Sequence, residues 1–107
     1  MADAIIELAD DAFAAEVATG VTLVEFYGTY CPSCRLLEPA LDRIAGTYRG
    51  RAKIARINVD EYAGAAVDHM VSDIPTLVFY RDGAEEGRMF GAQKEETLAA
   101  ELERLLA

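Results

Sequence analysis

Long apolar runs and basic residues are both scarce in this sequence, and each scarcity excludes a class of function. No apolar stretch approaches the roughly 20 residues that a membrane-spanning helix needs. The chain has 10 lysines and arginines against 19 aspartates and glutamates, which gives a formal net charge of -9. Because nucleic acids and anionic membrane surfaces repel an acidic protein, we expect neither to be a partner.

Stretches rich in proline, serine or glycine are also absent, as are blocks of like charge and internal repeats. A chain of 107 residues without such linkers predicts a single domain over residues 1–107. The first residues, Met1 to Ala4, lack the basic and apolar segments of a signal peptide. We therefore expect a cytoplasmic monomer in a reducing compartment.

Cysteine and histidine are rare as well, and this limits the metal chemistry available to the chain. Cys31, Cys34 and His69 are the only residues of these two types. A zinc site needs about four ligands, so we expect no metal here. The position of His69, near the end of a predicted helix, is typical of a capping or surface histidine rather than a catalytic one.

The two cysteines that are present lie close together, separated only by Pro32 and Ser33 after an apolar run at residues 21–27. Two thiols at this spacing can close a small disulfide ring and reopen it, as a dithiol redox catalyst requires. In a reducing compartment, this arrangement favours a catalytic pair over a structural disulfide.

Strand and helix patterns alternate along the chain. The apolar patterns predict strands at residues 21–27, 53–59, 76–80 and 88–90, and helices at 10–17, 31–50, 61–69 and 93–106. Asp10 or Asp11 is expected to cap the first helix, and Asp60 the third. Pro39 is expected to kink the second helix without ending it. This order predicts an α/β fold with a central mixed β-sheet and helices on both faces.

Six segments carry a resemblance to a known family over nearly the whole chain. They are residues 22–27 before Cys31-Pro32-Ser33-Cys34-Arg35, then Pro39, residues 56–60, residues 74–77, and Gly91-Ala92. Together they resemble the thioredoxins. The resemblance implies the thioredoxin fold and a thiol-disulfide oxidoreductase that reduces protein disulfides. Since the chain has no nucleotide-binding fingerprint, we expect no cofactor and an external reductase, such as thioredoxin reductase, as the source of electrons.

Catalytic roles follow from the position of each cysteine. Cys31 lies at the predicted helix start, where free amide groups and the helix dipole stabilise a thiolate, so we predict that it is the nucleophile. Cys34, one turn later, is the predicted resolving thiol. As helix N-cap, Cys31 should accept hydrogen bonds from the amides of Ser33 and Cys34, because Pro32 occupies the first helical position, and the Ser33 hydroxyl should add a further donor.

Glu25 is a carboxylate within an apolar strand, where burial makes it bind a proton more readily than in water. In the family, the residue at this position is usually Asp and is implied to help deprotonate the second cysteine, which makes Glu25 the predicted proton acceptor. Arg56 falls where the family usually has a lysine near this carboxylate. Two alternatives stay open: a Glu25 that bends out to solvent, and an Arg56 that is simply a surface strand residue.

The resemblance also implies a groove that binds an extended peptide beside the cysteines, with Ile74-Pro75 as the family's cis-proline loop. The implied substrate-binding residues are Tyr30, Pro32, Ser33, Asp73, Ile74, Pro75, Phe90, Gly91 and Ala92. Tyr27 and Tyr30 stand where the family usually has tryptophan. Asp73 replaces a residue that is commonly small or apolar and adds negative charge at the expected mouth of the groove.

Two other functions remain compatible with the sequence. One is a non-catalytic binding module that uses the groove to hold a partner chain. The other is a disulfide oxidase or isomerase that acts in an oxidising compartment, which the lack of a signal peptide disfavours. A reduction potential and turnover on a protein disulfide would separate these functions from a reductase.

Overall fold

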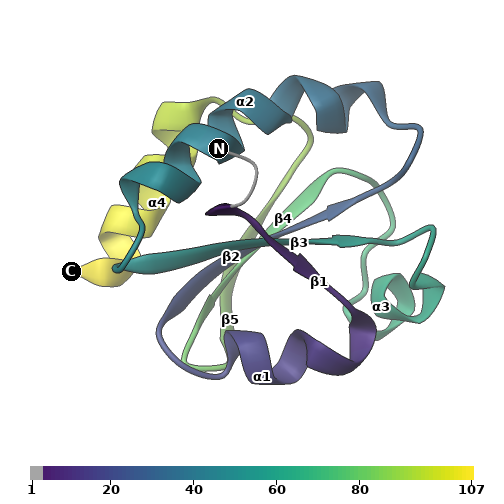
Figure 1. Cartoon of the computed structure of the whole chain (residues 1–107), viewed down its shortest axis with the longest axis horizontal. Coiled ribbons are helices and arrows are strands. Elements are labelled where there is room, and N and C mark those ends of the chain that lie inside the picture. The colour runs from purple at the N-terminus through teal and green to yellow at the C-terminus, as the bar shows by residue number, and fades with distance from the viewer. Residues whose placement is uncertain (1–3) are drawn as a thin grey trace.

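A computed structural model describes residues 4–107. Residues 1–3, which belong to the segment without a signal-peptide pattern, lie outside this range. The elements in chain order are β1 (Ile6–Leu8), the 3-10 helix η2 (Asp10–Ala12), α1 (Phe13–Val17), β2 (Val21–Tyr27), α2 (Pro32–Thr47), β3 (Ala52–Asn58), α3 (Ala63–Asp68), β4 (Thr76–Arg81), β5 (Ala84–Phe90) and α4 (Glu95–Leu106) (Figure 1).

The strands form one five-stranded mixed sheet in the order β1-β3-β2-β4-β5. β1, β3 and β2 are parallel to one another, whereas β4 and β5 are antiparallel to their neighbours. β2 lies in the middle, and its first six residues are all buried. A strand covered on both faces can be apolar throughout, which explains why residues 21–27 form an almost continuous apolar run.

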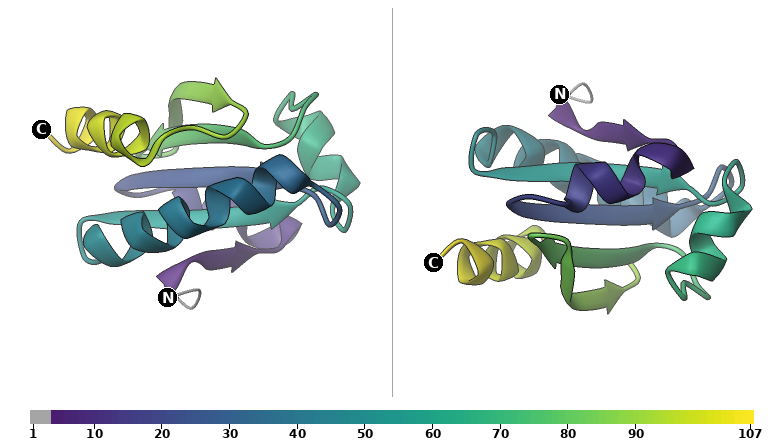
Figure 2. Two further views of the ribbon diagram at one scale, coloured as in Figure 1. Left: turned by 90° about the horizontal axis from the view of Figure 1, so that it is seen from above. Right: turned by 90° about the horizontal axis from the view of Figure 1, so that it is seen from below.

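Helices cover both faces of the sheet and form two separate cores. α2 and α4 pack on one face, where Leu37, Leu41, Leu98 and Leu102 meet Leu23, Ile54 and Phe79. On the other face, Phe13 and Val17 of α1 and Ala65 of α3 pack against Val24, Phe26, Ile57 and Val78. Figure 2 shows this arrangement, with α2 in front of the sheet in one view and α1 in front of it in the other. The predicted fold class is therefore confirmed.

The strand pairing also brings three distant segments to one end of the sheet. In the antiparallel pair of β2 and β4, Phe26 lies opposite Thr76, and Thr76 also lies opposite Phe90 of β5. The end of β2, the start of β4 and the end of β5 are therefore neighbours. The loop with the cysteines, the loop before Thr76 and the residues after Phe90 all leave the sheet at this place.

The predicted helix caps are wrong. Ala9 is the N-cap of η2, with Asp10 and Asp11 inside that helix, and Tyr62 is the N-cap of α3. Asp60 instead accepts a hydrogen bond from the backbone of Thr29, so a long-range contact replaces the local one.

Other element boundaries differ from the predictions by a few residues. The short strand β1 was not predicted, because three residues are too few for an alternating pattern to stand out. β5 begins at Ala84 rather than at residue 88, since its first four residues, 84–87, have no alternating apolar pattern. α2 continues through Pro39, as predicted.

Candidate active site

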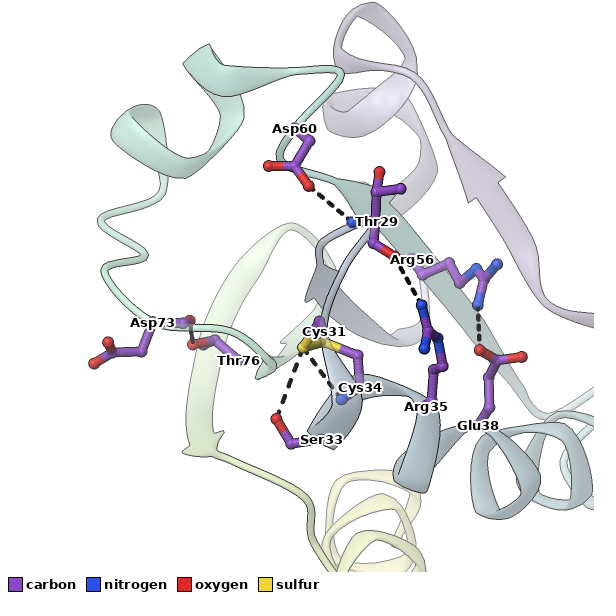
Figure 3. Close-up of a disulfide and its surroundings, with 10 residues drawn as sticks. All are labelled: Thr29, Cys31, Ser33, Cys34, Arg35, Glu38, Arg56, Asp60, Asp73 and Thr76. Atoms are coloured by element: carbon purple, nitrogen blue, oxygen red, sulfur yellow. Dashed lines mark hydrogen bonds and ion pairs between the residues drawn. A yellow bond between two sulfur atoms is a disulfide. The ribbon is translucent and has the colours of Figure 1, made fainter.

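Cys31 and Cys34 form a disulfide at the start of α2, with their Cα atoms 5.2 Å apart. Cys31 is the N-cap residue, with extended φ and ψ of -137° and 95°, and Pro32 occupies the first turn of the helix. Proline fits there because its missing N–H has no partner at a helix start. The predicted position of both residues at the beginning of the helix is confirmed (Figure 3).

Two groups of the first helical turn approach the sulfur of Cys31. The backbone N–H of Cys34 donates a hydrogen bond to Sγ at 3.2 Å, as predicted. Among residues 4–107, the backbone N–H of Ser33 makes no hydrogen bond to this sulfur, although one was expected. The Ser33 hydroxyl lies 3.7 Å from the same sulfur. Of the two donors expected from Ser33, the hydroxyl therefore approaches the sulfur and the amide does not.

Exposure does not separate the two cysteines in the oxidised state. Cys31 is 5% exposed and Cys34 is 4% exposed. The asymmetry between them lies in their helical positions, because Cys31 caps the helix and Cys34 lies inside its first turn. Only the cap position receives the free N–H groups of a helix start.

Glu25 lies in the middle of β2 and is only 1% exposed, so it does not bend out to solvent. Neither of its carboxylate oxygens has a hydrogen-bond partner among residues 4–107. Burial raises the pKa of Glu25 from 4.5 to about 7, while the charge of Arg56 opposes this rise and the charges of Glu38 and Glu7 support it. A carboxyl group with this pKa can accept and release a proton near neutral pH.

A cavity of about 250 Å³ joins Glu25 to the second cysteine. Its lining residues are Glu25, Tyr27, Gly28, Thr29, Cys34, Arg35, Glu38, Arg56 and Asn58. Several of these side chains are polar, and the volume is sufficient for a few water molecules. Water in this cavity would connect the Glu25 carboxyl to Cys34 without a direct contact.

The loop before β4 and the end of β5 lie together beside the cysteine loop. The Ile74–Pro75 peptide bond is cis, as the family resemblance implied. The N–H of Gly91 donates to the carbonyl of Pro75 at 2.8 Å, with a positive φ of 79° at Gly91 that suits glycine. Ile74 packs against Gly28 so closely that a Cβ there would lie 2.6 Å from Ile74 Cδ1.

Several other residues of the predicted groove have exposed side chains. Tyr30 is 88% exposed and Phe90 is 61% exposed, which leaves two aromatic rings available for contact with a partner. Ala92 is exposed as well. Asp73 accepts a hydrogen bond from the Thr76 hydroxyl through its backbone carbonyl, and its carboxylate points away from the sulfur atoms in Figure 3.

Comparison with known proteins places this geometry in a family. The sequence profile of the thioredoxin family matches residues 4–104. The chain belongs to the thioredoxin family. It is 37% identical over 103 residues to a thioredoxin of Staphylococcus epidermidis, a match that covers 96% of this chain and 99% of that protein. Thioredoxins of Staphylococcus saprophyticus and Staphylococcus aureus show the same identity over the same shares.

As a member of the thioredoxin family with a disulfide at the start of α2, the protein is a thiol-disulfide oxidoreductase. The thioredoxin relatives further identify its activity as reduction of disulfides, which confirms the prediction from the sequence. In this family, protein disulfides are the general substrate class and a reductase is the general partner. Among residues 4–107, no helix has the length and apolarity that crossing a membrane requires.

Sequence reasoning missed the residues that hold the cysteine loop of this thioredoxin in place. Asp60 Oδ2 accepts a hydrogen bond from the Thr29 N–H at 2.8 Å, and Asn58 Nδ2 donates to Thr29 Oγ1 at 3.2 Å. Arg35 donates to the Thr29 carbonyl at 3.4 Å. Asn58 ends β3 and Asp60 follows it, and because β3 is parallel to β2, the C-terminal ends of the two strands lie at the same edge of the sheet. These contacts depend on the strand pairing, which no local pattern in the sequence shows.

The single histidine lies away from the disulfide, among the helices on the other face. His69 is the C-cap residue of α3, and its ring stacks on Phe13 of α1 with 4.1 Å between ring centroids. This agrees with the capping position that the sequence predicted.

Proposed function

We propose that Cys31 is the nucleophile of this disulfide reductase, Cys34 the resolving thiol and Glu25 the proton acceptor for Cys34. The observation that carries this proposal is the hydrogen bond from the Cys34 N–H to Sγ of Cys31. In the reduced protein the same donor would stabilise a thiolate at Cys31, because a charged sulfur accepts a stronger hydrogen bond than a neutral one.

In the first step, the Cys31 thiolate attacks one sulfur of a substrate disulfide. The substrate S–S bond breaks, its other sulfur leaves as a thiolate, and Cys31 is joined to the substrate by a mixed disulfide. The departing thiolate takes a proton from the solvent.

In the second step, Cys34 gives its proton to Glu25 through water in the cavity and attacks Sγ of Cys31. The mixed disulfide breaks, and the second substrate sulfur leaves as a thiolate. The substrate has then gained two electrons and the protein has lost two, which yields the Cys31–Cys34 disulfide. A Glu25 pKa of about 7 suits this exchange, since the group takes up the proton and later releases it to solvent.

Substrates would bind as extended segments in the groove beside the disulfide. We assign to it Tyr30, Pro32, Ser33, Asp73, Ile74, Pro75, Phe90, Gly91 and Ala92. The exposed rings of Tyr30 and Phe90 and the cis peptide at Pro75 support this assignment. We further propose a cytoplasmic monomer, with an external reductase such as thioredoxin reductase restoring the two thiols.

Trapping of the mixed disulfide tests the division of roles. Cys34→Ser should accumulate a covalent complex with a disulfide-bonded substrate protein, detected by non-reducing electrophoresis and mass spectrometry. Cys31→Ser is the matched control and should accumulate none. A complex that forms equally well through Cys34 would contradict the assignment, and turnover without any trapped complex would contradict the two-step route.

A further inference from the structure

Three charged residues form a row across the sheet next to the active site. In the parallel pairing, Arg56 of β3 lies opposite Glu25 of β2 on one side and opposite Glu7 of β1 on the other. Partners in neighbouring strands are about 4.8 Å apart, and their side chains point to the same face. Arg56 therefore lies between two carboxylates, both of them adjacent in the sheet.

Arg56 contacts only one of these two carboxylates. Its Nε donates to Glu7 Oε1 at 2.8 Å, while Glu25 accepts no hydrogen bond from the described residues. A further carboxylate, Glu38 of α2, lies 3.8 Å from Arg56 Nη1, the pair drawn in Figure 3. The guanidinium thus has its ionic contacts with Glu7 and Glu38, and none with Glu25.

Tyr27 fixes this arrangement from β2, two residues after Glu25 and on the same face. Its ring lies under the guanidinium, with 4.4 Å from Arg56 Cζ to the ring centroid. Its hydroxyl donates a hydrogen bond to Glu7 Oε2. One oxygen of Glu7 therefore binds the arginine and the other binds the tyrosine. A tryptophan at position 27 would offer no hydroxyl for the second bond.

We propose that Glu7 and Glu38 are positioning residues that hold the Arg56 guanidinium away from Glu25, and thereby keep Glu25 able to take up the proton of Cys34. This inference rests on the proton-acceptor role proposed above for Glu25. It assigns a function to two carboxylates that do not touch the disulfide, and to the hydroxyl of Tyr27 that steadies one of them.

The physical reason is that Glu25 competes with Glu7 and Glu38 for one cation, the Arg56 guanidinium. An opposite charge within about 4–6 Å lowers the pKa of a carboxyl group by about 1–3 units. A guanidinium that turned towards Glu25 would therefore lower the proton affinity of its carboxylate and make it too weak a base to take the proton of the Cys34 thiol at neutral pH. The titratable and charged groups around Glu25 are Glu7 from β1, Tyr27 from β2, Arg56 from β3, and Cys34, Arg35 and Glu38 from α2.

Titration of Glu25 in the oxidised protein tests the proposal directly, because disulfide-bonded cysteines do not titrate. The side-chain carboxyl carbon of Glu25 would be followed by NMR from about pH 4 to about pH 9. In Glu7→Gln/Glu38→Gln the Glu25 midpoint should fall by about one pH unit or more. Glu61→Gln/Glu96→Gln removes the same charge from exposed positions and corrects for the change in net charge. A midpoint equal to that of this control would overturn the proposal.

A third variant shows whether the effect passes through Arg56. When Glu7→Gln/Glu38→Gln is added to Arg56→Gln, only the direct charges of the two carboxylates are lost, so the midpoint should fall much less, relative to Arg56→Gln alone, than it does when Arg56 is present. Equal falls with and without Arg56 would overturn the positioning role. Should the double variant not fold, as judged from its NMR spectrum, Glu38→Gln alone serves, since the Glu38 side chain is 49% exposed. It should show a smaller fall of the same sign.

Separate measurements distinguish the positioning role of Glu7 and Glu38 from the proton-acceptor role of Glu25. Glu25→Gln reports on the proton-acceptor role alone, through the rate at which Cys34 resolves the mixed disulfide. An unchanged rate in Glu25→Gln would remove the proton-acceptor role of Glu25, whereas the NMR midpoints would still report whether Glu7 and Glu38 hold Arg56 away from it. An altered rate with unchanged midpoints would keep the role of Glu25 and remove the positioning by Glu7 and Glu38.

Discussion

The backbone N–H of Cys34 donates a hydrogen bond to Sγ of Cys31 over 3.2 Å, so one cysteine supports the other through its main chain. The donor is one of the free N–H groups of the first turn of α2, which would otherwise lack a partner. The sulfur of Cys31 therefore has the place that a capping Ser or Asp oxygen has in other helices.

The first prediction follows from this contact and concerns thiol reactivity. In the reduced protein, alkylation near neutral pH should modify Cys31 at least about ten times faster than Cys34, because only Cys31 receives the helix-start donors. Mass spectrometry of peptides from a time course of iodoacetamide treatment gives the two rates. Similar rates at both positions would remove the basis for the nucleophile assignment.

The second prediction concerns the Ser33 hydroxyl, which lies 3.7 Å from the Cys31 sulfur. Ser33→Ala should raise the pKa of the Cys31 thiol and make the protein more reducing, since it removes a donor that favours the reduced thiolate. A hydrogen bond to a charged group contributes at most about 3 kcal/mol, or about 60 mV for a two-electron couple.

Equilibration with a glutathione buffer followed by thiol trapping measures the potentials of both proteins. Thr19→Ala, a change at an exposed turn far along the chain from the disulfide, is the control and should leave the potential unchanged. If Ser33→Ala proved equally or more oxidising than the original protein, the hydroxyl would have no part in thiolate stabilisation.

The third prediction uses the burial of Glu25. Its pKa is raised from 4.5 to about 7 in the folded protein, so the folded state binds more protons than the unfolded state between these values. The free energy of unfolding should therefore decrease as the pH rises from about 4.5 to about 7. The difference between these pKa values corresponds to about 3 kcal/mol.

Urea unfolding of the oxidised protein between about pH 5 and about pH 8 measures this decrease. Glu25→Gln should abolish the decrease and make the protein more stable than the original at the upper end of the range, because a buried amide carries no charge. Glu96→Gln, at an exposed position of α4, should keep it. Parallel pH profiles for Glu25→Gln and the original protein would show that Glu25 keeps its ordinary pKa.

The fourth prediction concerns the contact between Gly28 and Ile74. Gly28→Ala would place a Cβ 2.6 Å from Ile74 Cδ1, so the Ile74 side chain must move. We expect a loss of about 1–3 kcal/mol in stability, as is usual for an overpacked contact, together with slower turnover of a protein disulfide. Ile74→Val removes the Cδ1 atom and should restore part of both losses in the double variant. Purely additive effects of the two changes would show that this contact does not position the loop.

The central part of the fold was predictable because its signals are local. The run at residues 21–27 is apolar on both faces, and a strand of that kind must lie inside a sheet. The start of α2 at the cysteines was also readable, since proline is favoured in the first turn of a helix. The burial of Glu25 follows from its apolar neighbours in the same strand.

The contacts that refine the site were not predictable, because each joins residues that are distant in sequence. Asp60 looked like a helix cap from its neighbours, yet it binds Thr29, which lies 31 positions earlier. The pairing of Arg56 with Glu7 depends on the register of β1, a strand of three residues without a recognisable pattern. No local sequence pattern distinguishes Glu7, which Arg56 binds, from Glu25, which it does not bind.

The first turn of α2, at the disulfide, and the rest of the helix have different tasks. The first turn carries Cys34 and the cap contact to Cys31, whereas Leu37, Leu41 and Ile44 further along are each 1% exposed and anchor the helix in the core. The core thereby sets the effective concentration of the Cys34 thiol at the Cys31 sulfur, a quantity that determines how readily an intramolecular disulfide closes. A substitution that leaves a cavity at Leu41, more than a turn away, would make the position of the Cys34 thiol less fixed. It would thereby shift the redox equilibrium without altering any group near the sulfurs.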